Sequence, residues 1–348
     1  MDKLNKSLGL ALSLEKKLYN AIKPLLIVSQ FFCVAPIGDN RLQPLKWISP
    51  KVILHISWCT LVCVYILTSI YFEYLQKKIP LRTVQKPLFF SEYFVFVCHI
   101  TFLVPACYFK HKLCAQYIRT TVSIDCSLAA FGKIPKFGIL KRFTFIHLTL
   151  WMVYIVSVMA IIAFWDEMTI IESFDNLIVY LIPNFIIGIS MIQYYILLFI
   201  IYLRWKFLYK AIQEFKQKYE TDNRLAKLRI SQEILDLLRG IYCNLEIFTK
   251  EVNSTFSISI LIIYFGSFIN LSLNIFFVYK CIDDENVMAI TFFLYSFIWA
   301  VMHMGKMFCV LYFNHLILVE KDKIAVVVKN LNPLNLEMEI TVRIIIYV

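Results

Sequence analysis

Long apolar stretches separated by shorter polar segments dominate the pattern of this 348-residue chain. Six stretches are long enough to cross a hydrocarbon core of about 30 Å as helices, because a helix rises about 1.5 Å per residue. They cover residues 52–72, 89–109, 143–164, 177–202, 256–279 and 287–307, the last with an apolar continuation to residue 318. The pattern therefore predicts an all-α membrane protein, a polytopic bundle of about six transmembrane helices.

Basic residues fall mainly on alternate connections between these stretches. Lys and Arg are numerous before the first stretch, between the second and third, and between the fourth and fifth. The connections after the third and fifth stretches are acidic instead, with Asp166, Glu167, Asp283 and Asp284. Because Lys and Arg near span ends are retained in the cytosol, this bias predicts a cytosolic N-terminus and a cytosolic C-terminus. The basic residues between positions 77 and 86, in the first outer loop, are the exception.

The composition excludes a soluble domain and gives no reason to expect nucleic acid as a partner. Hydrophobic residues make up 60% of the chain and charged residues only 17%. The net charge of +11 arises on segments that flank the membrane, where topology and attraction to anionic lipids account for it. Membrane lipids are therefore the partners that the charge predicts.

The helical pattern does not end with the fourth stretch. Apolar residues recur at spacings of three and four on both sides of a polar break at residues 220–223. The first set is Trp205, Leu208, Ile212, Phe215 and Tyr219, and the second is Ile234, Leu238, Ile241, Leu245, Phe248 and Val252. Such apolar seams predict two antiparallel amphipathic helices, a cytosolic hairpin over residues 203–255.

The sixth stretch also continues inward, through Phe308, Leu311 and Tyr312. The fourth, fifth and sixth helices are therefore predicted to project into the cytosol as one bundle. Two interpretations of its seams stay open. They bury one another within a subunit, or a remaining apolar face is the surface on which subunits assemble.

No internal repeat or Gly/Ser-rich linker divides the chain, so we predict one membrane domain with two cytosolic flanks. Residues 1–51 form the cytosolic N-terminal segment, which begins with an amphipathic helix and not a signal peptide. Residues 52–318 form the transmembrane bundle, including the cytosolic hairpin 203–255. Residues 319–348 form a cytosolic tail.

The sequence contains none of the compact signatures of nucleotide binding, zinc proteolysis or serine hydrolysis, GxxxxGK[ST], HExxH and GxSxG. We therefore predict that the chain is not an enzyme, and we expect no catalytic residue, metal ligand or cofactor. Of its ten cysteines only Cys281 falls in a predicted outer loop, so no disulfide is expected.

Polar and aromatic side chains gather on the outer parts of the last three stretches. Spacings of four residues place them on shared helix faces. These predicted ligand-binding residues are Tyr180, Asn184, Asn270, Asn274, Thr291, Tyr295 and Trp299, the last three in a stripe that continues to His303. Aromatic rings beside amides suit a small organic molecule in a cavity that opens outward. Alternatively they are interfacial anchors and contacts between helices, and Lys306 extends to the inner interface.

Two segments resemble the insect gustatory receptor family. Residues 23–36, KPLLIVSQFFCVAP, are similar to the segment that precedes the first span of that family. Residues 237–245, LLRGIYCNL, and residues 252–258, VNSTFSI, are similar to its inner helix with the Asn and Phe that enter the membrane. The resemblance implies a plasma-membrane chemoreceptor subunit, a ligand-gated cation channel that detects small-molecule tastants and assembles as a homo- or heterotetramer through its inner helices.

Members of that family end with a seventh span that lines the pore. Here residues 343–348 are too short to cross a membrane, so the resemblance predicts a shortened subunit that does not conduct alone. Three alternatives stay open: an odorant-receptor-like subunit of the same superfamily, a G-protein-coupled receptor with the opposite N-terminal orientation, and a secondary transporter with inverted repeats.

Overall fold

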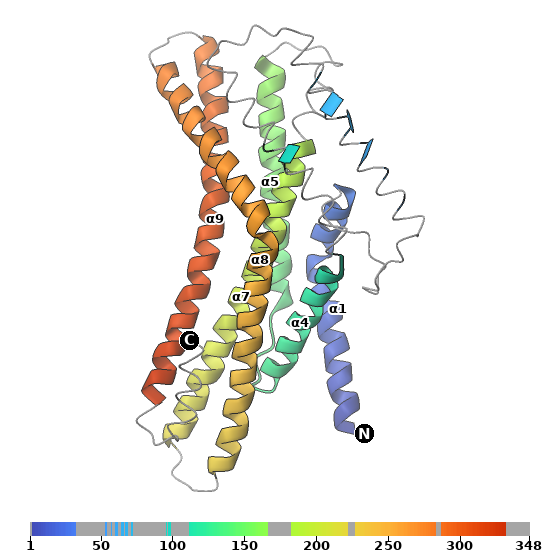
Figure 1. Cartoon of the computed structure of the whole chain (residues 1–348), viewed down its shortest axis with the longest axis vertical. Coiled ribbons are helices and arrows are strands. Elements are labelled where there is room, and N and C mark those ends of the chain that lie inside the picture. Colours follow the sequence, from blue (N-terminus) through green and yellow to red (C-terminus); the bar gives the residue numbers. More distant parts are fainter. Residues whose placement is uncertain are drawn as a thin grey trace.

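A computed structural model of the chain describes residues 2–32, 111–165, 182–221, 227–282 and 287–331, together with isolated positions between 53 and 98. Within these residues the regular elements are helices, which form an elongated bundle (Figure 1). They are α1 (Asp2–Phe31), α4 (His111–Ala129), α5 (Phe137–Trp165), α7 (Ile182–Thr221), α8 (Lys227–Ile282) and α9 (Val287–Leu331). The prediction of an all-α bundle is confirmed.

Four of the described helices are long and apolar enough to cross a membrane. The segments that meet this condition are Phe137–Val158, Asn184–Lys218, Glu233–Phe276 and Ser296–Lys329. They correspond to the predicted third, fourth, fifth and sixth stretches. The predicted first and second stretches lie largely outside the described residues.

The outer half of α8 has the side-chain distribution of a helix that faces lipid. Its exposed positions are large and apolar, with Ile258, Leu261 and Phe268 all more than 60% exposed. Its polar residues Asn270 and Asn274 are buried instead. A soluble helix shows the reverse arrangement, because water favours polar groups on the outside. The predicted fifth stretch therefore packs its polar side inward.

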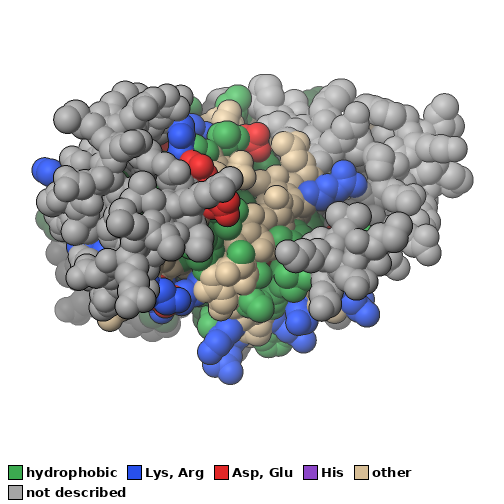
Figure 2. Space-filling model, turned by 90° about the horizontal axis from the view of Figure 1, so that it is seen from below, with side chains coloured by type: hydrophobic (Ala, Val, Ile, Leu, Met, Phe, Trp, Pro, Cys, Tyr) green, Lys and Arg blue, Asp and Glu red, His purple; other side chains and the backbone are tan. Residues whose placement is uncertain are grey.

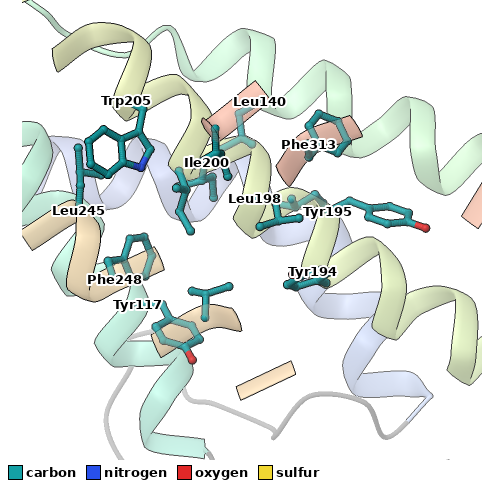
Figure 3. Close-up of a cluster of buried hydrophobic side chains, with 14 of the residues drawn as sticks. Tyr117, Leu140, Tyr194, Tyr195, Leu198, Ile200, Trp205, Leu245, Phe248 and Phe313 are labelled. Atoms are coloured by element: carbon teal, nitrogen blue, oxygen red, sulfur yellow. The ribbon is translucent and has the colours of Figure 1, made fainter. Parts of the chain in front are cut away.

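The centre of the bundle is α7. Its most apolar window is 72% buried, whereas that of α5 is only 17% buried. Helices α1, α4, α5, α8 and α9 all contact it. Toward its inner end, Tyr117 of α4 packs on Phe248 of α8 with ring centroids 5.6 Å apart, close to Trp205 of α7 (Figure 3). The outer part of α7 thus continues from a tightly packed core.

The predicted inner hairpin is present. Helix α7 runs to Thr221, α8 begins at Lys227, and both apolar seams point into the core. Trp205 and Leu208 on α7 and Leu245 on α8 have no exposed surface. The seams therefore bury one another within one subunit, which is the first of the two interpretations of the sequence. Ile234 is only half-buried, and the side chain of Tyr219 lies outside the described part of the structure.

The inner part of α9 packs on the core through residues that the sequence did not single out. Phe308, Leu311 and Tyr312 are exposed, while Phe313 and Ile317 are buried against the core. Nearly every position in this segment is apolar, so periodicity could not identify the buried face. The helix also continues without interruption to Leu331, past residue 318.

The N-terminal helix packs against the bundle along one face. Its residues Leu14, Leu18, Ala21 and Leu25 are buried at spacings of four, three and four. They contact α4, α5 and α7. Figure 1 shows the start of α1, the junction of α7 and α8, and the end of α9 at one end of the bundle. Figure 2 views this end and shows several Lys and Arg side chains there. The grouping of these segments at one end agrees with the charge pattern. That this end faces the cytosol stays a prediction.

Candidate functional site

A cavity lies between α7, α8 and α9. Its volume is about 290 Å³, counting the space that opens to the surroundings. The lining residues are Val95, Asn184, Ile187, Ile263, Gly266, Ser267, Asn270, Trp299, His303 and Lys306.

The helical repeat explains why these residues meet. On α8 the lining positions recur every three or four residues, and on α9 Trp299, His303 and Lys306 do the same. Residues at this spacing share one face of a helix. Asn184 and Ile187 form the corresponding stripe on α7. Three such stripes converge on one space, so each helix contributes a polar group and an apolar or aromatic one.

The structure brings together three of the seven predicted ligand-binding residues. Asn184, Asn270 and Trp299 all line the cavity and are buried. Tyr180 lies outside the described residues, and Thr291 and Tyr295 lie on α9 with side chains outside the described part of the structure.

Asn274 is buried one turn outward from Asn270 but does not line the cavity. Its Nδ2 donates a hydrogen bond of 2.7 Å to the backbone oxygen of Asn270. The i, i+4 spacing that predicted a shared face is correct. The second amide is used within its own helix, so only the first faces the cavity.

Lys306 departs from the sequence-based interpretation. It is 7% exposed and lines the cavity, whereas a lysine that extends to the interface would expose its ammonium. Its Nζ lies 5.2 Å from the ring centroid of Trp151 on α5, over the indole face. This cation–π contact keeps the side chain inside the bundle.

A layer of aromatic residues supports the α9 stripe. The ring of Trp299 is stacked on that of His303 at 5.6 Å, and Tyr154 of α5 meets Trp299 edge-on at 6.1 Å. Trp151 and Tyr154 were missed by the sequence analysis. Their spacing of three residues within the third stretch was the available signal, but it is common in membrane helices.

Two tyrosines fix the backbone of α9 beside the cavity. The hydroxyl of Tyr195 on α7 donates to the backbone oxygen of Lys306 at 2.9 Å. The hydroxyl of Tyr264 on α8 donates to the backbone oxygen of Met307 at 3.2 Å. Because each bond links a different helix to neighbouring residues of α9, the three walls of the cavity are tied together at this level.

Two glycines allow close contacts around the site. A Cβ atom at Gly188 of α7 would lie 1.9 Å from Cε2 of Trp151, and a Cβ at Gly266 of α8 would lie 2.2 Å from Cγ2 of Val95. Real Cβ atoms do not approach other atoms so closely, since such overlap is strongly repulsive. Both positions therefore require glycine for the present packing.

The cavity offers amides, an imidazole, an ammonium and an indole to an occupant. Among the described residues, no group of three His, Cys, Asp or Glu side chains is placed to hold a metal ion. The arrangement can recognise a small molecule by hydrogen bonds and stacking.

Comparison with known proteins identifies the family of this chain. The family model described as 7tm chemosensory receptor matches residues 22–346. The putative gustatory receptor 59f of Drosophila melanogaster is 28% identical over 301 residues, which are 86% of this chain and 70% of that relative. The resemblance to insect gustatory receptors is therefore confirmed, and the matched family is one of receptors, not of enzymes. The chain is a multi-pass membrane protein that belongs to the 7tm chemosensory receptor family.

Proposed function

We propose that this chain is a gustatory-type receptor subunit of the plasma membrane that binds a small organic tastant in the cavity between α7, α8 and α9. The observation that supports this proposal is the convergence of Asn184, Asn270 and Trp299 from three helices on one space. Two amides and an indole can orient a small molecule by hydrogen bonds and stacking. The printed name of the relative, a putative gustatory receptor, supports a tastant as the ligand.

Ligand binding would gate a cation channel through the helices that form the cavity. The three helices that line the cavity also form the inner bundle, where α7 reaches Thr221, α8 begins at Lys227 and α9 reaches Leu331. A ligand that contacts all three stabilises the arrangement to which it binds best. A change in packing at the cavity is then transmitted along continuous helices to the inner bundle.

Subunits would associate as a homo- or heterotetramer through this inner bundle. Ile247 on α8 and Leu318 and Val326 on α9 are each more than 50% exposed, although they lie in its inner part. Large apolar side chains exposed outside the lipid region favour contact with another subunit. Apolar residues on α5, such as Leu150 and Val156, would instead face membrane lipids.

The test is a recording of tastant-evoked currents in cells that express the full chain at their surface. Asn270→Ala and Trp299→Ala should raise the half-maximal tastant concentration by about tenfold, since each removes a contact worth roughly 1–2 kcal/mol. Asn244→Ala, on an exposed position of α8, is the matched control and should respond as the parent does. Identical responses from all three variants would show that these cavity residues only pack the bundle.

A further inference from the structure

Exposed basic side chains gather on two helices that pack together, α1 and α5, near the predicted inner boundary of the membrane. This basic patch consists of Lys16, Lys17 and Lys23 on α1 and Lys141 and Arg142 on α5. None of them takes part in an ion pair among the described residues, and α5 contains no Asp or Glu. Glu15, beside them on α1, is half-buried. The patch therefore carries positive charge that the described part of the chain does not neutralise.

Two ring contacts with α7 place the basic residues of both helices at a similar level. Phe32, directly after α1, is stacked on Phe185 of α7 at 4.7 Å, and Phe143 of α5 is stacked on Phe199 at 4.2 Å. Both helices run in the direction opposite to α7 (Figure 1), and the two α7 residues are about 21 Å apart along its axis. The part of α1 that lies level with Phe143 is therefore about 21 Å before Phe32, at residues 16–18. Because α1 also packs against α5, the two groups of cations are neighbours.

Exposed apolar side chains follow the basic ones on the same helix faces. On α1, Phe31 lies two spacings of four residues beyond Lys23 and is 65% exposed. On α5, Leu150 lies two spacings of four beyond Arg142 and is 62% exposed. Residues at this spacing share one face of a helix. Each face therefore changes from cationic to apolar along its length, as a leaflet changes from headgroups to acyl chains.

The retention of Lys and Arg in the cytosol does not explain this arrangement. That rule concerns how many cations lie near a span end and not the helix face that they occupy. On α1, Lys16 and Lys23 lie opposite the face that buries Leu14 and Leu18 in the core. Clusters of four to eight Lys and Arg beside a membrane span attract acidic lipids, because the headgroups carry negative charge. The basic patch has the size and the position of such a cluster.

We propose that the basic patch binds the headgroup of an acidic phospholipid, phosphatidylserine, from the leaflet at the inner end of the bundle. The phosphate and carboxylate of the headgroup contact the cations of α1 and α5, and the acyl chains lie along the apolar faces beside Phe31 and Leu150. The inference goes beyond the proposed function, because none of the residues of the patch lines the candidate cavity.

Binding of dioctanoyl phosphatidylserine and dioctanoyl phosphatidylcholine to the purified, detergent-solubilised full chain tests this proposal. The affinity is measured from the shift in unfolding temperature as the lipid concentration rises. Phosphatidylserine should bind about thirtyfold more tightly, since each of two cations at the headgroup contributes about fivefold. Raising NaCl from about 0.1 M to about 1 M should remove most of this preference, because salt screens exposed charges. Equal affinity for the two lipids at low salt would overturn the inference.

Double variants locate the site on the two helices. Lys141→Gln with Arg142→Gln should remove most of the preference for phosphatidylserine, and so should Lys16→Gln with Lys23→Gln on the other helix. Lys141→Arg with Arg142→Lys keeps both charges and should retain the preference. Full preference in both glutamine variants would show that the lipid binds elsewhere.

The matched control removes two basic residues from another part of the inner bundle. Lys210 on α7 and Lys329 on α9 are also exposed, so Lys210→Gln with Lys329→Gln changes the net charge by the same amount. This variant should prefer phosphatidylserine as strongly as the parent does. A loss equal to that of the α5 variant would assign the preference to net charge and contradict a site between α1 and α5.

Glycerophosphoserine, the headgroup without acyl chains, tests whether the occupant is a lipid. It should bind at least about a hundredfold more weakly than dioctanoyl phosphatidylserine, because the apolar faces of α1 and α5 then have no hydrocarbon to cover them. Equal affinity of the two compounds would identify the patch as a site for a free phosphate-bearing molecule and contradict the proposal of a membrane lipid.

Discussion

Arg204 on α7 and Asp125 on α4 form a two-point ion pair in the buried inner part of the bundle. Arg204 Nε donates to Asp125 Oδ1 at 3.0 Å, and Nη2 donates to Oδ2 at 2.7 Å. The side chains are 2% and 0% exposed, respectively. Arg204 Nη1 also donates to the backbone oxygen of Ile200 at 3.2 Å. The pair therefore ties the helix that follows the predicted second stretch to the central helix.

Asp125→Ala should destabilise the protein by about 3–5 kcal/mol, because it leaves a guanidinium buried without its carboxylate. Thermal unfolding of the detergent-solubilised chain, followed by size-exclusion chromatography, measures this loss. Glu214→Ala is the control: Glu214 pairs with Lys133, but its side chain is 52% exposed, so its removal should cost less than about 1 kcal/mol. Similar losses of stability in the two variants would mean that breaking the buried ion pair costs no more than breaking the exposed one.

Arg204→Met should destabilise the protein less than Asp125→Ala does, and the size of the loss in stability should depend on pH. Burial raises the pKa of Asp125, and in the parent the Arg204 guanidinium opposes that rise. Without Arg204, the folded variant binds a proton at Asp125 at a pH where the unfolded chain does not. The stability that this proton gives is present at low pH and is lost as pH rises through the folded-state pKa.

The melting temperature of Arg204→Met should therefore rise, relative to the parent, when the pH is lowered from about 8 to about 5. Asp125→Ala should show no such rise, because the guanidinium that it leaves cannot lose its proton. A pH dependence common to both variants would assign the effect to other groups.

Gly188→Ala should destabilise the protein by about 1–3 kcal/mol, since the new Cβ would overlap the Trp151 indole. Gly240→Ala is the control on α8, where a Cβ would meet nothing within 4 Å and should instead stabilise the helix by up to about 1 kcal/mol. Unfolding temperatures of the two variants make the comparison. A Gly188→Ala protein as stable as the parent would show that Trp151 can move aside at no cost.

The inner hairpin was predictable because polar and apolar residues alternate there with a helical period. Leu245 and Trp205 stand out against charged neighbours, so their seam could be identified. The same reasoning identifies no face on α9, because Phe308, Leu311 and Phe313 are all apolar and only the fold distinguishes the exposed side chains from the buried ones. Periodicity contains information only where both kinds of residue occur.

The sequence was sufficient to predict which helices line the candidate cavity, but not that a lysine side chain lies in its wall. Asn184, Asn270 and Trp299 could be placed on shared faces by counting residues. Lys306 was misassigned because a lysine near a span end usually reaches the interface. Its inward course depends on the ring of Trp151, which belongs to another helix 155 positions earlier in the chain. Contacts between helices so distant in sequence cannot be derived from the spacing within either one.

Leu245→Asp should reduce the yield of folded protein strongly, because it places a carboxylate in a seam with no exposed surface, at a cost of several kcal/mol. Leu237→Asp is the control on the same helix, since Leu237 is 38% exposed and its carboxylate can stay hydrated. The monodisperse fraction in fluorescence-detected size-exclusion chromatography gives the comparison. Equal yields would show that water reaches the hairpin seam.

Labelling of Cys281 from outside the cell tests the orientation of the chain. Cys281 lies at the end of α8, which terminates at Ile282, and Figure 1 shows that end opposite the start of α1. If the Lys and Arg bias is interpreted correctly, a membrane-impermeant maleimide should label intact cells at Cys281, and Cys281→Ser should remove that label.

In the same cells, an epitope tag at the N-terminus should be inaccessible to antibody until the membrane is permeabilised. The basic segments before the first stretch and around the hairpin make this orientation favourable, because moving their charges across the bilayer is costly. Cys126 and Cys243, on the inner helices, should react only after permeabilisation. An exposed tag on intact cells, with Cys281 protected, would reverse the orientation and place the candidate cavity on the cytosolic side, where no external tastant reaches it.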